Sequence, residues 1–138
     1  MDPRRHLTVL HMALCLGCAA FLGVTAYLWG NGTVPLGTHG ELPTLSACAV
    51  AAAVVLPVLA VVLFRRNVRT LVPGADMRLR GACVMHWALI EGALFLNLIT
   101  FMLLGEPRHW LLGLGLLLVM VLRAPTERRM QRWTTGTP

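Results

Sequence analysis

Residues 42–64 read LPTLSACAVAAAVVLPVLAVVLF and contain no Asp, Glu, Lys or Arg. A helix needs about 20 apolar residues to cross the roughly 30 Å hydrocarbon core of a bilayer. Residues 7–29 form a second uncharged stretch of this length, and residues 81–104 form a third, in which Glu91 is the one charged side chain. The pattern predicts three membrane-spanning helices.

A fourth apolar stretch, residues 110–122, is shorter. Counted from Pro107, a favoured first helical residue, to Arg123, it becomes a short span over residues 107–123 with an arginine near each end. A re-entrant or interfacial helix is the alternative. The segment 106–109 is typical of a tight turn between two spans. We therefore expect an all-α membrane protein, a four-transmembrane-helix bundle that forms a single membrane domain over residues 1–138.

The composition agrees with a membrane domain. Hydrophobic residues make up 57% of the chain and charged residues 13%, whereas about a quarter of the residues in a soluble domain are charged. No phosphate-binding glycine loop and no nucleophile–base pair with an aqueous pocket is recognisable, so we expect no enzyme. The cysteines lie in or beside the apolar stretches, where they are typical packing residues, and we expect no metal site.

The basic residues indicate the orientation. All twelve are arginines, and only Arg108 falls on the side opposite the other eleven. By the positive-inside rule, both termini and the loop between the second and third spans face the cytoplasm, which predicts a multi-pass protein of a bacterial inner (cytoplasmic) membrane. The arginines expected to set the topology or to meet lipid headgroups are Arg65, Arg66, Arg69, Arg78, Arg80, Arg128, Arg129 and Arg132. They are split among short segments beside the bilayer, so we expect no nucleic-acid partner.

The chain repeats itself weakly at an offset of 75 residues. Between residues 11 and 28 six identities recur, of which the pairs His11/His86 and Gly17/Gly92 carry the signal because these residues are rarer in apolar helices. The repeat predicts two helical hairpins related by an axis along the membrane normal.

Polar side chains form matching stripes on the first and third predicted helices. At 100° per residue, His86, Asn97 and Thr100 share one face of the third helix, and His11 and Thr25 share the corresponding face of the first. Such stripes turn inward in lipid, where they either join the two helices by hydrogen bonds or serve a function. Histidines at matched depth would also suit axial ligation of a haem, so a bis-histidine haem site at His11 and His86 is an alternative, with no cofactor as the main expectation.

Glu91 approaches the middle of the membrane, and no Arg or Lys lies within any span to neutralise it. A carboxylate at that depth costs about 2.5–3.5 kcal/mol on insertion scales. We expect Glu91 to be protonated, or to hydrogen-bond to His11, Asn97 or a partner molecule. It is either a functional carboxyl that responds to protons or cations, or a neutral group that holds helices together.

Two segments resemble a known group of proteins. The stretch Ala88-Leu-Ile-Glu91-Gly92-Ala-Leu-Phe95 and the later Arg123-Ala-Pro-Thr-Glu-Arg128 resemble motifs of small, uncharacterised bacterial four-span membrane proteins. These share A-L-[ILV]-E-G in the third helix and an R-P-T-like ending, from which Ala124 departs here. The resemblance implies four spans and an important Glu91, and it names no reaction. The ending also predicts a short cytoplasmic tail helix over residues 126–133 that lies at the interface.

Three functions remain open from the sequence. The first is a non-catalytic subunit or assembly partner of an inner-membrane complex, with membrane lipids and either its own copies or other membrane subunits as partners. Small size, short loops and small-residue helix faces favour this expectation. The second is a proton-coupled small transporter or proteolipid-like ion translocator that uses Glu91. The third is the bis-histidine haem protein.

Overall fold

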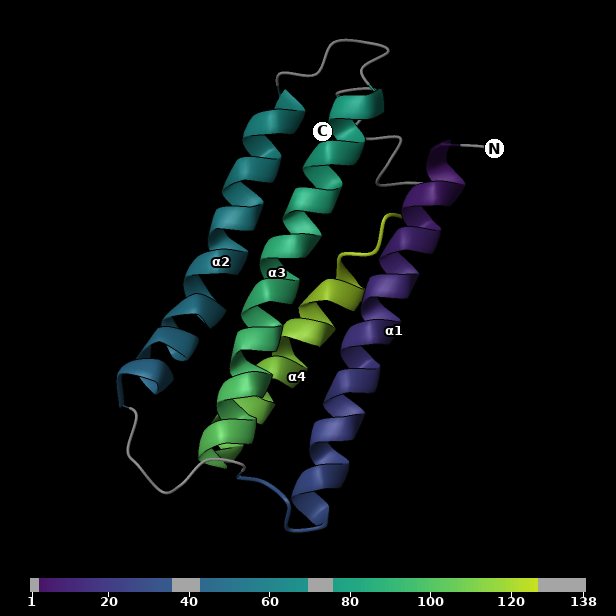
Figure 1. The fold of residues 1–138 in the computed structure, drawn as a ribbon. Coiled ribbons are helices and arrows are strands. Elements are labelled where there is room, and N and C mark those ends of the chain that lie inside the picture. The colour runs from purple at the N-terminus through teal and green to yellow at the C-terminus, as the bar shows by residue number, and fades with distance from the viewer. Residues whose placement is uncertain (1–2, 36–42, 70–75, 127–138) are drawn as a thin grey trace.

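The computed structural model describes residues 3–35, 43–69 and 76–126, which form four helices and no strand (Figure 1). The helices are α1 (Pro3–Gly30), α2 (Pro43–Arg69), α3 (Asp76–Leu104) and α4 (Pro107–Leu122). The predicted all-α architecture is confirmed. Each helix covers the apolar stretch predicted for it where the structure describes it, and α2 and α3 continue past theirs into arginine-bearing turns. The predicted tail helix lies outside the described residues beyond Thr126.

Three of the helices, α1, α2 and α3, are long and apolar enough to cross a membrane. Helix α4 has 16 residues, which correspond to about 24 Å at 1.5 Å per residue. That length is shorter than the roughly 30 Å of a hydrocarbon core. The structure therefore supports a membrane protein with three helices of full spanning length and a fourth, shorter apolar helix.

Helix α3 is the centre of the bundle. It packs against each of the other three helices, and α4 in turn contacts α1 and α2. Helices α1 and α2 lie on opposite sides of the α3–α4 pair and scarcely touch each other (Figure 1). The described helices thus form one packed hairpin, α3–α4, flanked by two single helices, and the predicted relation between two equivalent hairpins is not shown.

The bundle has two ends with different chemistry. Helix α1 begins, α2 ends and α3 begins at one end, which carries Arg5, Arg65, Arg66, Arg78 and Arg80 and is called the arginine-rich end below. At the opposite end α1 ends, α2 begins and α3 turns into α4 (Figure 1). We call it the turn end.

A sharp turn joins α3 to α4 at the turn end. Gly105 adopts a φ of +70°, and its N–H donates to the carbonyl of Phe101 at 2.7 Å. A left-handed residue after the last turn is a common helix ending and favours glycine. Pro107 then starts α4 at a position where its missing N–H costs nothing. The turn brings the first residues of α4 against α3.

The core is built mainly from α3. One cluster joins Ile90, Ala93, Leu94 and Leu98 to buried residues of the other helices, namely Cys18, Leu22, Ala60, Leu116 and Met120. A smaller cluster at the arginine-rich end surrounds Trp87 and consists further of Leu7, Leu79 and Cys83. Most other apolar side chains of α1 and α2 face outward, as lipid contact requires.

Candidate functional site

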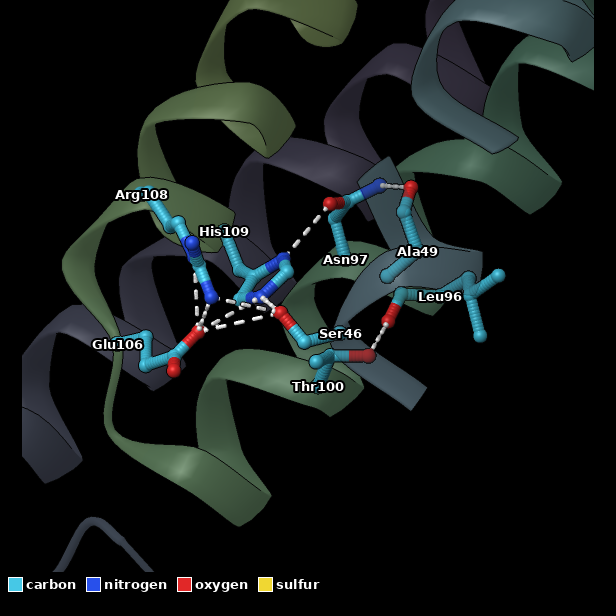
Figure 2. A network of polar contacts seen from close by, with 8 residues as sticks. All are labelled: Ser46, Ala49, Leu96, Asn97, Thr100, Glu106, Arg108 and His109. Atoms are coloured by element: carbon cyan, nitrogen blue, oxygen red, sulfur yellow. Dashed lines mark hydrogen bonds and ion pairs between the residues drawn. The ribbon is translucent and has the colours of Figure 1, made fainter. Parts of the chain in front are cut away.

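A polar network joins three helices at the turn end of the bundle (Figure 2). His109, in the first turn of α4, lies at its centre and is fully buried. Ser46 reaches it from the first turns of α2 and Asn97 from α3, while Glu106 and Arg108 flank it at the start of α4. Five polar side chains from separate parts of the sequence therefore meet at one point.

Asn97 orients the imidazole of His109. Its Nδ2 group donates to the carbonyls of Ala49 and Ala93, each at 2.9 Å. The remaining amide oxygen, Oδ1, lies 3.1 Å from His109 Nδ1 and can only accept. His109 therefore carries a proton on Nδ1, and the network as a whole assigns this tautomer.

The other ring nitrogen of His109 faces two oxygen atoms. Its Nε2 lies 2.9 Å from Ser46 Oγ and 3.1 Å from Glu106 Oε2. When His109 is neutral, Nε2 accepts the hydroxyl proton of Ser46. When His109 is doubly protonated, Nε2 donates to the Glu106 carboxylate in a charge-assisted bond. The hydroxyl of Ser46 has one proton, so it donates either to Nε2 or to Glu106 Oε2 and not to both at once.

Glu106 and Arg108 close the network on its outer side. Arg108 donates to Glu106 Oε2 from Nε at 2.8 Å and forms an ion pair through Nη2 at 2.7 Å. This hydrogen bonding lowers the pKa of Glu106 below its usual value, outweighing the opposite effect of burial, and the Ser46 hydroxyl adds a further bond. Glu106 is therefore a carboxylate at neutral pH.

The network resembles a hydrolase relay in its Ser–His–Asn order, but its contacts favour a structural clamp. Ser46 is 5% exposed. Its oxygen accepts from Arg108 Nη2 at 2.9 Å, and its hydroxyl lies within 3.3 Å of Glu106 Oε2. A nucleophile needs a base and an open approach, whereas this hydroxyl is a link between neighbours. The clamp ties the ends of α2, α3 and α4 together.

Glu91, the residue singled out from the sequence, lies near the midpoint of α3 and is half-buried. It faces α1, where its charge acts on Cys15 and Cys18. No hydrogen bond reaches its carboxyl from the described residues. The expected partners within the chain are wrong, because Asn97 is engaged by the clamp and His11 contacts Cys15 Sγ at 3.5 Å.

The polar stripes turn inward as predicted. His11, Thr25, His86, Asn97 and Thr100 are all buried. They do not hydrogen-bond α1 to α3, however. Thr25 donates to the carbonyl of Leu22 and Thr100 to that of Leu96, each within its own helix, and Asn97 joins α3 to α2 and α4. The stripes follow the packed faces, and only Asn97 among them makes hydrogen bonds between helices.

A haem between His11 and His86 does not fit these surroundings. The His11 ring packs on Trp87 with centroids 4.7 Å apart, and the His86 ring packs on Phe64 of α2 at 5.4 Å. A macrocycle would have to displace buried aromatic rings. No group of three or more His, Cys, Asp or Glu side chains suited to a metal ion occurs among the described residues.

The predicted topology arginines cluster at the arginine-rich end where the structure describes them. Arg65, Arg66 and Arg78 are exposed and Arg80 is half-buried. Arg69 ends α2, and its side chain, with Arg128, Arg129 and Arg132, lies outside the described part of the chain. The spatial grouping agrees with a single polar face of the membrane at this end.

No family model, curated protein or solved structure matches the chain. The resemblance to bacterial four-span proteins therefore stays a prediction, and the function rests on the chain's own geometry.

The sequence reasoning missed four members of the clamp: Ser46, Glu106, Arg108 and His109. The segment 106–109 was interpreted only as a turn. A usable signal was present, because a histidine in the first turn of α4 and an asparagine about two turns before the end of α3 must approach one another once Gly105 and Pro107 reverse the chain.

Proposed function

We propose that the protein is a non-catalytic subunit or assembly partner within a bacterial inner-membrane complex, and that the exposed face of α3 around Glu91 contacts the next subunit. The observation that carries the proposal is the Glu91 carboxyl, which is half-buried near mid-helix without a hydrogen-bond partner from the described residues. A polar group at that depth is costly unless another molecule satisfies it.

The face of α3 next to Glu91 suits the close approach of another helix. Gly81, Ala88 and Gly92 are exposed along it. A Cβ atom built on Gly81 or Gly92 would meet nothing within 4 Å. Small residues let helix backbones come close in lipid, where packing and polar contacts drive association. Because α1 and α2 scarcely touch, they leave this face of α3 uncovered.

The proposal includes an orientation. We infer that the arginine-rich end faces the cytoplasm, that both chain termini lie there, and that α4 completes a fourth, short span with Arg108 and Glu106 at the opposite interface. The arginine asymmetry supports this orientation. Local thinning of the bilayer or tilting of the neighbouring helices accommodates a span of about 24 Å at modest cost.

Assembly is tested with two matched glycine variants. Gly92→Leu places a bulky side chain on the α3 face, and Gly115→Leu places the same group on an exposed position of α4 that is equally open. We expect Gly92→Leu to reduce the size of the particle purified in mild detergent, measured by light scattering with mass spectrometry of its components, and Gly115→Leu to leave it unchanged. Equal behaviour of the two variants, or a monomeric wild type without partners, contradicts the proposal.

A second candidate function, a proton-coupled transporter or ion translocator, draws on the same carboxyl, because a half-exposed acid without a fixed partner is able to exchange a proton. Glu91→Gln separates the two functions. An assembly contact is retained by the amide, which still hydrogen-bonds, whereas proton exchange is abolished. We expect proteoliposomes of wild type and Glu91→Gln to show the same low proton flux, and a flux lost only in the variant would support the transporter.

A further inference from the structure

A cavity of about 290 Å³ lies between α2, α3 and α4 toward the arginine-rich end. Its walls are mostly apolar and come from Pro57 and three valines of α2, Ile90 of α3 and Val119 of α4. Val58 and Val62 are more than half exposed, so the cavity opens sideways toward lipid. Two polar side chains, His86 and Arg123, complete the lining.

The cavity lies beside the last turns of α4, which line it through Val119 and Arg123. Helix α4 stops at Leu122 while α2 and α3 continue for several more turns (Figure 1). Arg123, the C-cap of α4, therefore lies alongside the bundle instead of beyond it.

The two polar residues of the cavity lie on its side nearer the arginine-rich end, at about the depth of Val62. Counting about 1.5 Å per residue from the turn end, Arg123 lies about 24 Å along the bundle, His86 about 27 Å and Val62 about 28 Å. Ile90 and Pro57 lie at about 21 Å and Val119 at about 18 Å. A hydrocarbon core of roughly 30 Å that starts at the turn end thus places His86 and Arg123 near its inner boundary, at the level of headgroups.

His86 lines the cavity but is itself buried. The side chain is 5% exposed, and its Nδ1 is buried without a hydrogen-bond partner among the described residues. The charge that the cavity presents at this level is therefore that of Arg123, whose side chain is exposed.

We propose that the cavity binds one acidic lipid, with its chain against the valines and its head at Arg123. The guanidinium of Arg123 takes an ionised oxygen of the head, a phosphate or a carboxylate oxygen, as expected for a cation at a cytoplasmic pocket between helices. The volume is at the low end for ligand pockets and holds the upper part of one chain.

The test measures lipid binding to the purified full-length protein in mild detergent by native mass spectrometry. The probes are dioleoyl phosphatidic acid, oleic acid and dioleoyl phosphatidylcholine. We expect saturable binding of one acidic molecule, at least about tenfold tighter than phosphatidylcholine. Preference for phosphatidic acid identifies a phospholipid as the natural occupant, and preference for oleic acid identifies a free fatty acid; both outcomes support the site.

Three variants localise the binding. Arg123→Gln should remove the preference for the acidic head, and Arg5→Gln, an equal charge change at an exposed residue outside the cavity, should retain it. Val119→Trp should fill the cavity and weaken every ligand with a chain, while thermal unfolding reports that each variant is folded. The proposal is overturned if phosphatidylcholine binds wild type as tightly, if neither acidic probe binds, or if the two arginine variants behave alike.

Discussion

The buried histidines of this protein show that the surroundings of a side chain decide whether its polar atoms find hydrogen-bond partners. Both ring nitrogens of His109 have hydrogen-bond partners, so the ring is fixed in orientation and tautomer. His11 and His86 are equally buried, yet each keeps an Nδ1 without a partner. A buried atom of that kind costs about 1–3 kcal/mol. The ring of His109 therefore contributes to the stability of the bundle, whereas the buried Nδ1 atoms of His11 and His86 detract from it.

Removing Asn97 should destabilise the clamp through His109. Asn97→Ala leaves His109 Nδ1–H buried without an acceptor, and we expect a loss of about 2 kcal/mol in the free energy of unfolding, measured by SDS titration in mixed micelles. The double variant Asn97→Ala/His109→Ala removes both partners and should lose clearly less than the sum of the single changes. Strict additivity would show that the two side chains do not interact.

The Glu106–Arg108 pair predicts a loss of stability in acid. Because the folded-state pKa of Glu106 is lowered, its contribution is present above the unfolded-state value of about 4.3 and is lost as the pH falls through the lower folded-state value. We expect the melting temperature in detergent to decline below about pH 4.3, and less steeply in Glu106→Gln. An identical acid decline in wild type and Glu106→Gln would rule out this origin. The effect should be small, because Glu106 is partly exposed and solvent screens the pair.

At the scale of elements, the approach of α4 to α3 depends on a single glycine. A Cβ atom on Gly113 would lie 2.8 Å from Leu98 Cδ2, and Leu98 is fully buried. Gly115, two residues further along α4, faces open space. Helix packing in membranes uses small residues in this way. The short α4 can thus pack tightly enough to place His109 against Asn97.

The matched pair Gly113→Val and Gly115→Val tests this contact. Both variants make the same change in the same helix, so effects of helix propensity cancel. Gly113→Val should force Leu98 to move and cost about 1–3 kcal/mol in the free energy of unfolding, whereas Gly115→Val should stay within about 0.5 kcal/mol of wild type. A comparable loss in both would indicate that propensity, and not the contact, decides.

The whole molecule divides into an arginine-rich end and a turn end. The arginine-rich end carries the exposed arginines of α2 and α3, and the cavity between α2, α3 and α4 lies toward it. The turn end carries the clamp, whose Glu106–Arg108 pair is its exposed charged part. If the bundle spans a membrane, these two ends face different compartments. The arginine content of each end predicts which compartment it faces.

Topology reporters test the orientation. A reporter fused after Pro138 and one inserted near Gly74 should both report the cytoplasm, and one at Gly37 should report the periplasm, because the predicted topology places eleven of the twelve arginines on one side. A periplasmic signal at Gly74 would overturn the inferred orientation. A periplasmic signal at Pro138 alone would show that α4 does not cross the membrane.

The sequence by itself determined the helices and the two ends. Long uncharged stretches can satisfy their backbone in lipid only as helices, so residues 7–29, 42–64 and 81–104 were predictable from composition and length. Helical periodicity places the polar residues of each stripe on one face of a helix. That face was expected to turn inward because polar groups avoid lipid.

Only the tertiary structure decided which of these helices touch and what their polar groups meet. Apolar helices carry little information about their neighbours, since lipid and another helix offer similar surroundings. The sequence predicts two related hairpins but does not predict that α3 and α4 lie between α1 and α2, which scarcely touch. It also gave Asn97 as one of several possible partners of Glu91, whereas Asn97 meets His109. Contacts of this kind depend on the close fit at Gly113 and on the turn at Gly105, which are set by three-dimensional packing.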